Sequence, residues 1–199
     1  MSSTEMTHDH GHNTDSIDVL GFWLYIMTDC VLFGSLFAAY LVLHHPHAYG
    51  PSLAPLVNLN YVLAETMFLL FSNLSFGLAM IASYKKKTSL SLQLLALTFV
   101  LGFCFVAMEL NEFIHLVHEG YSWTASASAS AFFTLVATHG LHVSFGLLWI
   151  LVMIYQGWKL GFSGIVQRRL TYLGLFWNFL DIVWIFVFTV VYLLGYIQS

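Results

Sequence analysis

The stretch from Tyr61 to Ser83 reads YVLAETMFLLFSNLSFGLAMIAS, and Glu65 is its only charged residue. A helix needs roughly 20 mostly apolar residues to cross a hydrocarbon core of about 30 Å. This stretch meets that length, and its remaining polar residues are small hydroxyls and one amide. It therefore predicts a membrane-spanning helix with an acidic group inside the membrane.

Four further stretches have the same character, so that the predicted spans are residues 19–43, 61–83, 92–113, 131–156 and 172–197. The chain of 199 residues is 59% hydrophobic and only 8% charged, which excludes an ordinary soluble domain. Lipid cannot satisfy backbone groups, and no span alternates in the manner of a membrane strand. The sequence thus predicts an all-α, polytopic bundle of five transmembrane helices.

The chain divides into a polar tail and a membrane domain. Residues 1–17 contain His8, His10 and His12 and are predicted to be a flexible cytoplasmic tail, with residues 18–199 forming the five-helix domain. The first residues contain neither Lys nor Arg, so no cleavable signal peptide is predicted. The short loops leave no room for a second domain.

The cationic residues indicate the orientation. All six lie in the loops after the second and fourth spans: Lys85, Lys86, Lys87, Lys159, Arg168 and Arg169. With five spans, these loops and the N-terminus share one side of the membrane. The positive-inside rule assigns that side to the cytoplasm and places the C-terminus in the periplasm.

Six ionisable side chains are predicted to lie at membrane depth, where such groups face a bundle interior or mark a functional site. Counting residues from the span ends gives two levels. One is an outer layer of glutamates and histidines, and the other is a mid-membrane layer of aspartates. The six residues are Asp29, Glu65, Glu109, His139, His142 and Asp181.

Helical periodicity places these groups on narrow stripes. At about 100° per residue, Glu65 shares a stripe with Ser72, Ala79 and Ser83. Corresponding polar or small stripes occur on the later spans, and we expect the bundle to pack through them. These stripes combine Gly102 with Glu109, His139 and His142 with Gly146, and Asp181 with Gly174, Asn178 and Tyr192.

Three chemical interpretations of the buried groups compete with simple hydrogen bonding between helices. His139 and His142 with Glu109 or Glu65 are suitable ligands for Zn, Fe or Cu. A haem would need histidines on facing helices, whereas the deep ones share one span. A proton relay would need polar groups across the whole membrane, and apolar turns separate the two layers. Interhelical hydrogen bonding is therefore the favoured interpretation.

Two other residue types carry expectations of their own. Trp149 and Trp184 lie too deep for an interfacial belt, so we expect them to pack against another subunit or bound lipid. Cys30 and Cys104 lie inside spans and are interpreted as buried thiols rather than a disulfide.

Four segments resemble the third subunits of haem–copper oxidases, in the same order along the chain. They are residues 21–33 (GFWLYIMTDCVLF), 107–112 (AMELNE), 138–143 (THGLHV) and 177–184 (WNFLDIVW). Members of this family that oxidise cytochrome c usually have seven spans. The five-span form is similar to the third subunits of bacterial bo-type ubiquinol oxidases. Two departures are Asn178, where the family often has His, and Asp29, where it often has Glu.

The resemblance implies an accessory, non-catalytic subunit of a proton-pumping ubiquinol oxidase in the bacterial inner membrane. It further implies that haems and copper belong to the catalytic subunit I, the main expected partner, and that this chain binds phospholipid, supports assembly and holds no cofactor or nucleic acid. The rival hypotheses are a stand-alone secondary transporter, which would predict broken helices near the midplane, and a small membrane cytochrome.

Overall fold

The computed structural model describes residues 9–43, 59–120, 124 and 126–193. Two features predicted from the sequence lie outside this part of the chain: His8 and the last residues of the fifth span. The side chains of His10 and His12 are also outside it. Predictions that concern these residues stay predictions.

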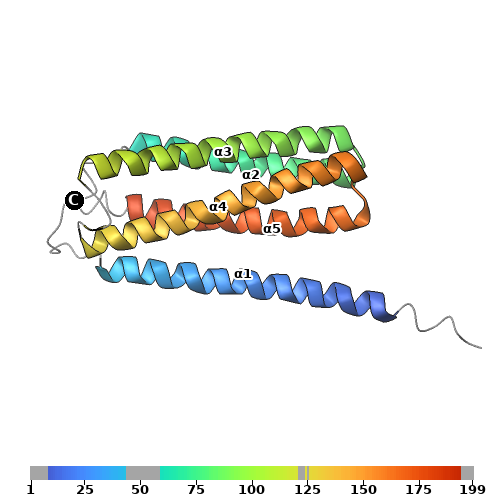
Figure 1. Ribbon diagram of the computed structural model, residues 1–199, viewed down its shortest axis with the longest axis horizontal. Coiled ribbons are helices and arrows are strands. Elements are labelled where there is room, and N and C mark those ends of the chain that lie inside the picture. The colour runs from blue at the N-terminus through green and yellow to red at the C-terminus, as the bar shows by residue number, and fades with distance from the viewer. Residues whose placement is uncertain (1–8, 44–58, 121–123, 125, 194–199) are drawn as a thin grey trace, which may run out of the picture. The chain divides into compact units, whose positions relative to one another are not determined.

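Helices account for nearly all of the described residues (Figure 1). They are α1 (Asp9–Leu43), α2 (Leu59–Tyr84), α3 (Thr88–His118), α4 (Ala127–Leu160) and α5 (Gly164–Val187), which continues into the π-helix η1 (Phe188–Leu193). Five helices are long and apolar enough to cross a membrane. The predicted fold class, an all-α protein with five transmembrane helices, is therefore confirmed for the described residues.

Several helices extend beyond the apolar spans predicted from the sequence. α1 begins at Asp9, although its apolar part begins at Val19. α3 continues to His118, and α4 begins at Ala127, where Ser126 accepts a hydrogen bond from the Ala129 backbone N–H at 3.0 Å. A side-chain oxygen at this position satisfies one of the free N–H groups of a helix start. The helices are thus longer than the hydrocarbon core requires.

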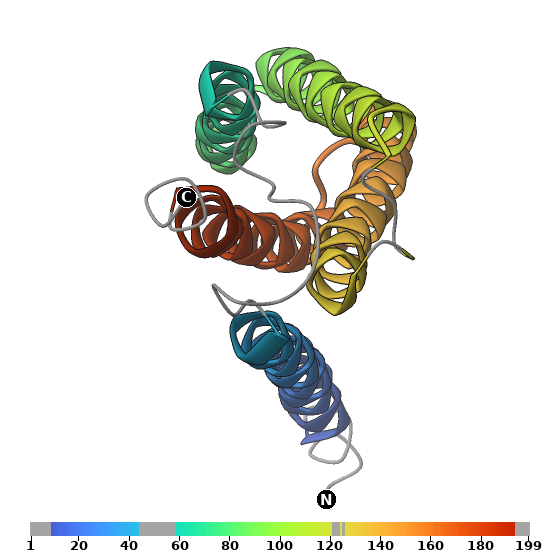
Figure 2. The same cartoon turned by 90° about the vertical axis from the view of Figure 1, so that its left-hand side faces the viewer.

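The chain forms two compact units, residues 1–35 and 36–199. In the described part of the first unit the backbone is helical. In the second unit, α2, α3, α4 and α5 each pack against their neighbours in the sequence, and α5 also packs against α2. The end-on view of these four helices shows the resulting closed circuit (Figure 2). The polar stripes therefore meet in the interior of a four-helix bundle.

The stripe on α2 packs against α3. Glu65, Ser72, Ala79 and Ser83 are all buried. Ser72 donates a hydrogen bond to the Thr98 carbonyl at 3.0 Å, and Ser91 on α3 donates to the Ala79 carbonyl at 2.9 Å. Small side chains let two helix backbones approach closely, and their hydroxyls then reach the opposite backbone. This explains the alternation of serine and alanine along the stripe.

Trp177 of α5 fills the centre of the bundle between two glycines. A Cβ atom added at Gly102 of α3 would lie 3.1 Å from the indole, and one added at Gly146 of α4 would lie 2.7 Å from it. The second distance is shorter than carbon atoms tolerate. Gly146 therefore has a steric reason to be glycine, and both glycines on the predicted stripes form the walls around one large buried ring.

Two expectations about exposure need correction. Cys30 and Cys104 are both free, as predicted, but Cys30 is exposed on its helix, so the buried-thiol interpretation is wrong for Cys30. Asn178 is also exposed, unlike the other members of the α5 stripe. It lies about 60° around the helix from Asp181, at the edge of the buried face.

Candidate functional site

Three glutamates gather at the end of the bundle where α2 begins and α3 ends. Glu65 comes from the second turn of α2, and Glu109 and Glu112 come from the last third of α3. All three are buried, and the Glu65 carboxyl lies within electrostatic range of the other two. We call these three residues the carboxyl cluster.

Glu112 is the one member of the carboxyl cluster that was not among the predicted buried ionisable residues. It lies three residues after Glu109, and residues at this spacing share one face of a helix. Its side chain is 7% exposed, and Tyr192 of η1 donates a hydrogen bond to its Oε2 at 3.1 Å. The spacing was visible in the sequence, but the partner came from the last turn of another helix.

Unsatisfied oxygens distinguish the cluster from an ordinary hydrogen-bonded core. Neither carboxyl oxygen of Glu65 has a hydrogen-bond partner among the described residues, and the same holds for Oε1 of Glu109. All Lys and Arg residues lie towards the opposite ends of these helices. The cluster is therefore not neutralised by ion pairs with Lys or Arg, and its oxygens can accept further hydrogen bonds.

Glu109 reaches across to α4 beside His139. A Cβ atom at Gly140 would lie 3.0 Å and 3.2 Å from the two Glu109 carboxyl oxygens. The backbone of α4 at Gly140 thus forms one wall of the carboxyl cluster. Glycine provides the space for the carboxyl group here, which explains why Gly140 follows the histidine.

His139 is fully buried among aromatic rings from two other helices. Its ring stacks on Trp184 of α5 with a centroid distance of 5.2 Å and meets Phe105 of α3 edge-on at 6.0 Å. The Trp184 indole N–H donates to the Thr66 hydroxyl of α2 at 3.0 Å. Four helices therefore meet around this histidine.

This arrangement corrects the expectation for Trp184. From its depth, Trp184 was expected to pack against another subunit or lipid, but its exposed fraction is 0%. The inward and outward faces of this helix are both apolar at this depth. The sequence therefore contains no signal that shows which way the Trp184 side chain points. Trp149, by contrast, is half-buried.

His142 lies one turn after His139 and is half-buried. Its Nδ1 lies 2.7 Å from the Thr138 carbonyl of the same helix, so this nitrogen is protonated and donates to the backbone. The structure thus places His139 in the aromatic interior and brings Nδ1 of His142 to its own helix backbone.

The two aspartates are held differently. Asp181 is buried on α5, and Asn73 of α2 donates a hydrogen bond to its Oδ2 at 3.0 Å. Asp29 lies on α1 and accepts a hydrogen bond from Tyr25, one turn earlier in the same helix. The two residues belong to separately described units, so their predicted common layer stays a prediction.

The described residues contain no group of three or more His, Cys, Asp or Glu side chains arranged to hold a metal ion. The carboxyl cluster and the residues around His139 hold the helices together by hydrogen bonding and packing. Hydrogen bonds join α2 to α5 and α3 to η1, and α4 packs against them through the His139 ring and the backbone at Gly140.

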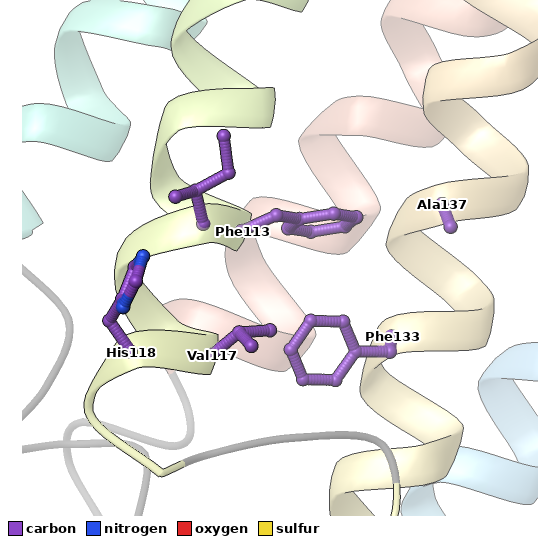
Figure 3. Close-up of a pocket in the computed structure, with 6 residues that line it drawn as sticks. Phe113, Val117, His118, Phe133 and Ala137 are labelled. Atoms are coloured by element: carbon purple, nitrogen blue, oxygen red, sulfur yellow. The ribbon is translucent and has the colours of Figure 1, made fainter.

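A separate apolar groove lies between α3 and α4, close to the end of α3. It has a volume of about 360 Å³ and is lined by Phe113, Ile114, Val117, His118, Phe133 and Ala137. Figure 3 shows the rings of Phe113 and Phe133 extending into the space between the two helices. Their centroids are 5.2 Å apart. We call this the α3–α4 groove.

Comparison with known proteins gives matches over almost the whole chain. Residues 2–196 match the family model described as cytochrome c oxidase subunit III. Among curated proteins, the Pseudomonas aeruginosa protein named cytochrome bo(3) ubiquinol oxidase subunit 3 is 53% identical, covering 94% of this chain and 90% of the relative. A Buchnera aphidicola protein of the same name is 44% identical over 92% and 94%. The Bacillus sp. PS3 protein named cytochrome c oxidase subunit 3 is 45% identical over 88% and 85%.

Proposed function

This chain belongs to the cytochrome c oxidase subunit III family, and on that premise we propose that it is an accessory subunit of a bacterial ubiquinol oxidase. The enzyme would oxidise ubiquinol, reduce oxygen to water and pump protons. The observation that carries the proposal is the 53% identity, over 94% of the chain, to a protein named as subunit 3 of such an oxidase.

We assign no step of the oxidase reaction to this chain. The interactions of its buried polar groups support a structural role, since Glu112 binds Tyr192 and Trp184 binds Thr66. The haems and copper would then reside in a partner, the catalytic subunit I. This chain would hold a rigid four-helix face against that partner and stabilise the assembled enzyme.

The buried residues receive structural roles in this proposal. Glu65, Glu109, His139 and His142 form an interhelical polar cluster on the outer half of the membrane, together with Glu112. Asp29 and Asp181 form a mid-membrane carboxyl layer. Substituting a member of either set should weaken the assembly before it affects the oxygen chemistry.

We further propose that the N-terminus lies in the cytoplasm and the C-terminus in the periplasm, because the six cations cluster in two loops on one side. The test uses a chain from which Cys30 and Cys104 have been removed. In spheroplasts with an intact inner membrane, a cysteine replacing Lys87 should stay protected from a membrane-impermeant thiol reagent. A cysteine replacing Ser126 should react with it. The reverse pattern would overturn the orientation.

We also propose that a phospholipid binds in the α3–α4 groove. Its lining consists mainly of aromatic and aliphatic side chains, which suit an acyl chain, and His118 near the end of α3 could donate to a phosphate. Replacing Ala137 with Phe would fill the groove. The complex should then co-purify with fewer phospholipid molecules, measured by mass spectrometry, than a complex that carries the exposed-face change Leu141→Phe.

The proposed function is tested by purifying the complex through a tag on this chain from bacterial membranes. The proposal expects haem to co-purify and oxygen consumption to be supported by a ubiquinol analogue. The similarity to a protein named cytochrome c oxidase subunit 3 favours a second candidate, in which reduced cytochrome c is the donor. Transport by the chain alone, without haem, would contradict both candidates.

A further inference from the structure

The carboxyl cluster concentrates more acid inside the bundle than the cations of this chain can neutralise. Glu65, Glu109 and Glu112 are 0%, 3% and 7% exposed, and all three lie within helices that can span a membrane. The Lys and Arg residues lie towards the opposite ends of these helices. Three ionised carboxylates would therefore place three negative charges together where water does not solvate them. A buried carboxyl without a cationic partner takes up a proton instead.

Hydrogen-bond donors are unevenly distributed over the cluster. Tyr192 donates to Oε2 of Glu112 at 3.1 Å, and a donor of this kind stabilises an ionised carboxylate. Glu65 differs, because neither of its oxygens has a partner among the described residues and the side chain is shielded from water. Oε1 of Glu109 also has no partner in the described part of the chain. Glu65 is therefore the member of the cluster least able to keep a negative charge.

The elements packed against α2 bring further acidic groups towards Glu65. These elements are α3, α5 and η1. Glu65 interacts electrostatically with Glu109 and Glu112 of α3, and the Tyr192 hydroxyl of η1 already donates to Glu112. On α5, Asp181 is bonded to an amide of α2 that lies about two helical turns from Glu65. None of these groups supplies a positive charge.

His139 of α4 is the alternative holder of a proton beside the cluster. It precedes Gly140, whose backbone faces the Glu109 carboxyl, and its ring is fully buried against aromatic rings of α3 and α5. Burial of this kind disfavours a charged imidazolium. A protonated carboxyl, in contrast, is uncharged and supplies a hydrogen-bond donor as well as an acceptor. The arrangement therefore favours a proton on a carboxyl group.

We propose that the carboxyl cluster is a proton-binding site, in which Glu65 is a neutral carboxylic acid in the folded bundle. The bound proton removes one of three negative charges and gives the cluster a second hydrogen-bond donor beside Tyr192. This inference goes beyond the proposed function and does not depend on it, because every group involved belongs to this chain.

Proton binding at this site links the stability of the bundle to pH. In the unfolded chain Glu65 is exposed to water and is ionised at neutral pH. The folded bundle keeps the proton, so folding takes up one proton from solution. The sign follows from linkage: stability falls as the pH rises, because the folded state binds more protons than the unfolded state. One retained proton changes the unfolding equilibrium constant about tenfold per pH unit.

Infrared spectroscopy of the full-length chain in lipid–detergent micelles tests the protonation state. At neutral pH, the wild-type spectrum minus that of Glu65→Gln should contain the C=O stretching band of a protonated carboxylic acid, which shifts when H2O is replaced by D2O. The control Glu119→Gln removes an exposed glutamate, and its difference spectrum should contain carboxylate bands instead. Carboxylate bands in the Glu65→Gln difference spectrum, without the protonated band, would overturn the proposal.

The pH dependence of unfolding is a second test, and its main arm uses the wild-type chain. Between about pH 7 and 8, ordinary carboxyl, lysine and tyrosine side chains do not change charge. In this interval the unfolding equilibrium constant should rise at least about tenfold per pH unit, and it should do the same in Glu119→Gln. A wild-type constant that is independent of pH would overturn the proposal, whether or not Glu65→Gln folds.

The folded Glu65→Gln variant identifies the residue that holds the proton. Its unfolding equilibrium constant should rise about tenfold less per pH unit than that of the wild type. A rise equal to that of the wild type would overturn the assignment to Glu65. Neither measurement involves haem or a partner subunit, so a negative result leaves the oxidase assignment intact, and failure of haem to co-purify leaves the proton-binding site intact.

Discussion

Replacing Tyr192 with Phe tests whether the carboxyl cluster fastens the bundle. The substitution keeps the ring, which meets Phe132 edge-on at 5.8 Å, and removes only the hydroxyl that donates to Glu112 at 3.1 Å. Because Tyr192 and Glu112 are 4% and 7% exposed, water cannot replace the lost donor. The variant therefore isolates one interhelical hydrogen bond.

The expected cost follows from two benchmarks. Hydrogen bonds between membrane helices average about 0.6 kcal/mol and reach about 1.7 kcal/mol, whereas buried bonds to charged groups contribute about 1.5–3 kcal/mol. A carboxyl acceptor buried on all sides belongs at the upper end of the membrane range. We expect Tyr192→Phe to lower the free energy of unfolding by about 1.5 kcal/mol, which is about a tenfold change in the unfolding equilibrium.

The assay is unfolding of the full-length chain in mixed lipid–detergent micelles, titrated with a denaturing detergent and followed by circular dichroism. A double-mutant cycle with Glu112→Gln should give a coupling energy of about 1 kcal/mol between the two residues. The control Tyr155→Phe removes the hydroxyl of a tyrosine that is 57% exposed, and it should change stability by less than about 0.5 kcal/mol. A Tyr192→Phe variant no less stable than this control would refute the reasoning.

Three further changes probe the packing of the bundle with the same titration. Gly146→Ala would place a methyl carbon 2.7 Å from the Trp177 ring and should lower the free energy of unfolding by about 1–3 kcal/mol. In the control Gly34→Ala, the added methyl meets nothing within 4 Å and should not destabilise the protein. Equal effects of the two changes would contradict the central position of Trp177. Trp184→Phe removes the donor to Thr66 and part of the wall around His139, and should cost about 2 kcal/mol or more. Trp158→Phe, at a position that is 77% exposed, is its control, and a loss no larger than the control's would show that Trp184 is not buried. Ser72→Ala should cost about 0.6 kcal/mol through the bond to the Thr98 carbonyl, and a stabilising effect would argue against that bond.

Periodicity was sufficient to predict the α2 stripe because Glu65, Ser72 and Ala79 are separated by multiples of seven residues, close to two helical turns each. Charge and apolar length were sufficient to predict five helices. These features depend on the local chain alone, and they could be obtained from a single sequence.

Other features depend on contacts between distant segments. Periodicity placed Tyr192 on the α5 stripe, and the side chain is buried, but its partner Glu112 lies 80 residues earlier in the chain, and a local pattern does not specify which helices face each other. Trp184 lies on a helix with several apolar faces, so its inward direction could not be inferred. Asn178 lies about 60° around the helix from Asp181. This offset places Asn178 at the edge of the stripe, where its side chain is exposed although that of Asp181 is buried.

The most direct test of the central claim compares oxidase turnover with the amount of this chain retained in the complex, for His139→Leu and Glu109→Gln. Turnover is expressed per haem, and retention is measured by quantitative mass spectrometry of the purified enzyme. If the buried groups fasten helices, retention should fall in both variants, and complexes that keep the chain should turn over at the wild-type rate. Full retention of either variant with abolished turnover would contradict a structural role and assign these residues to the reaction itself.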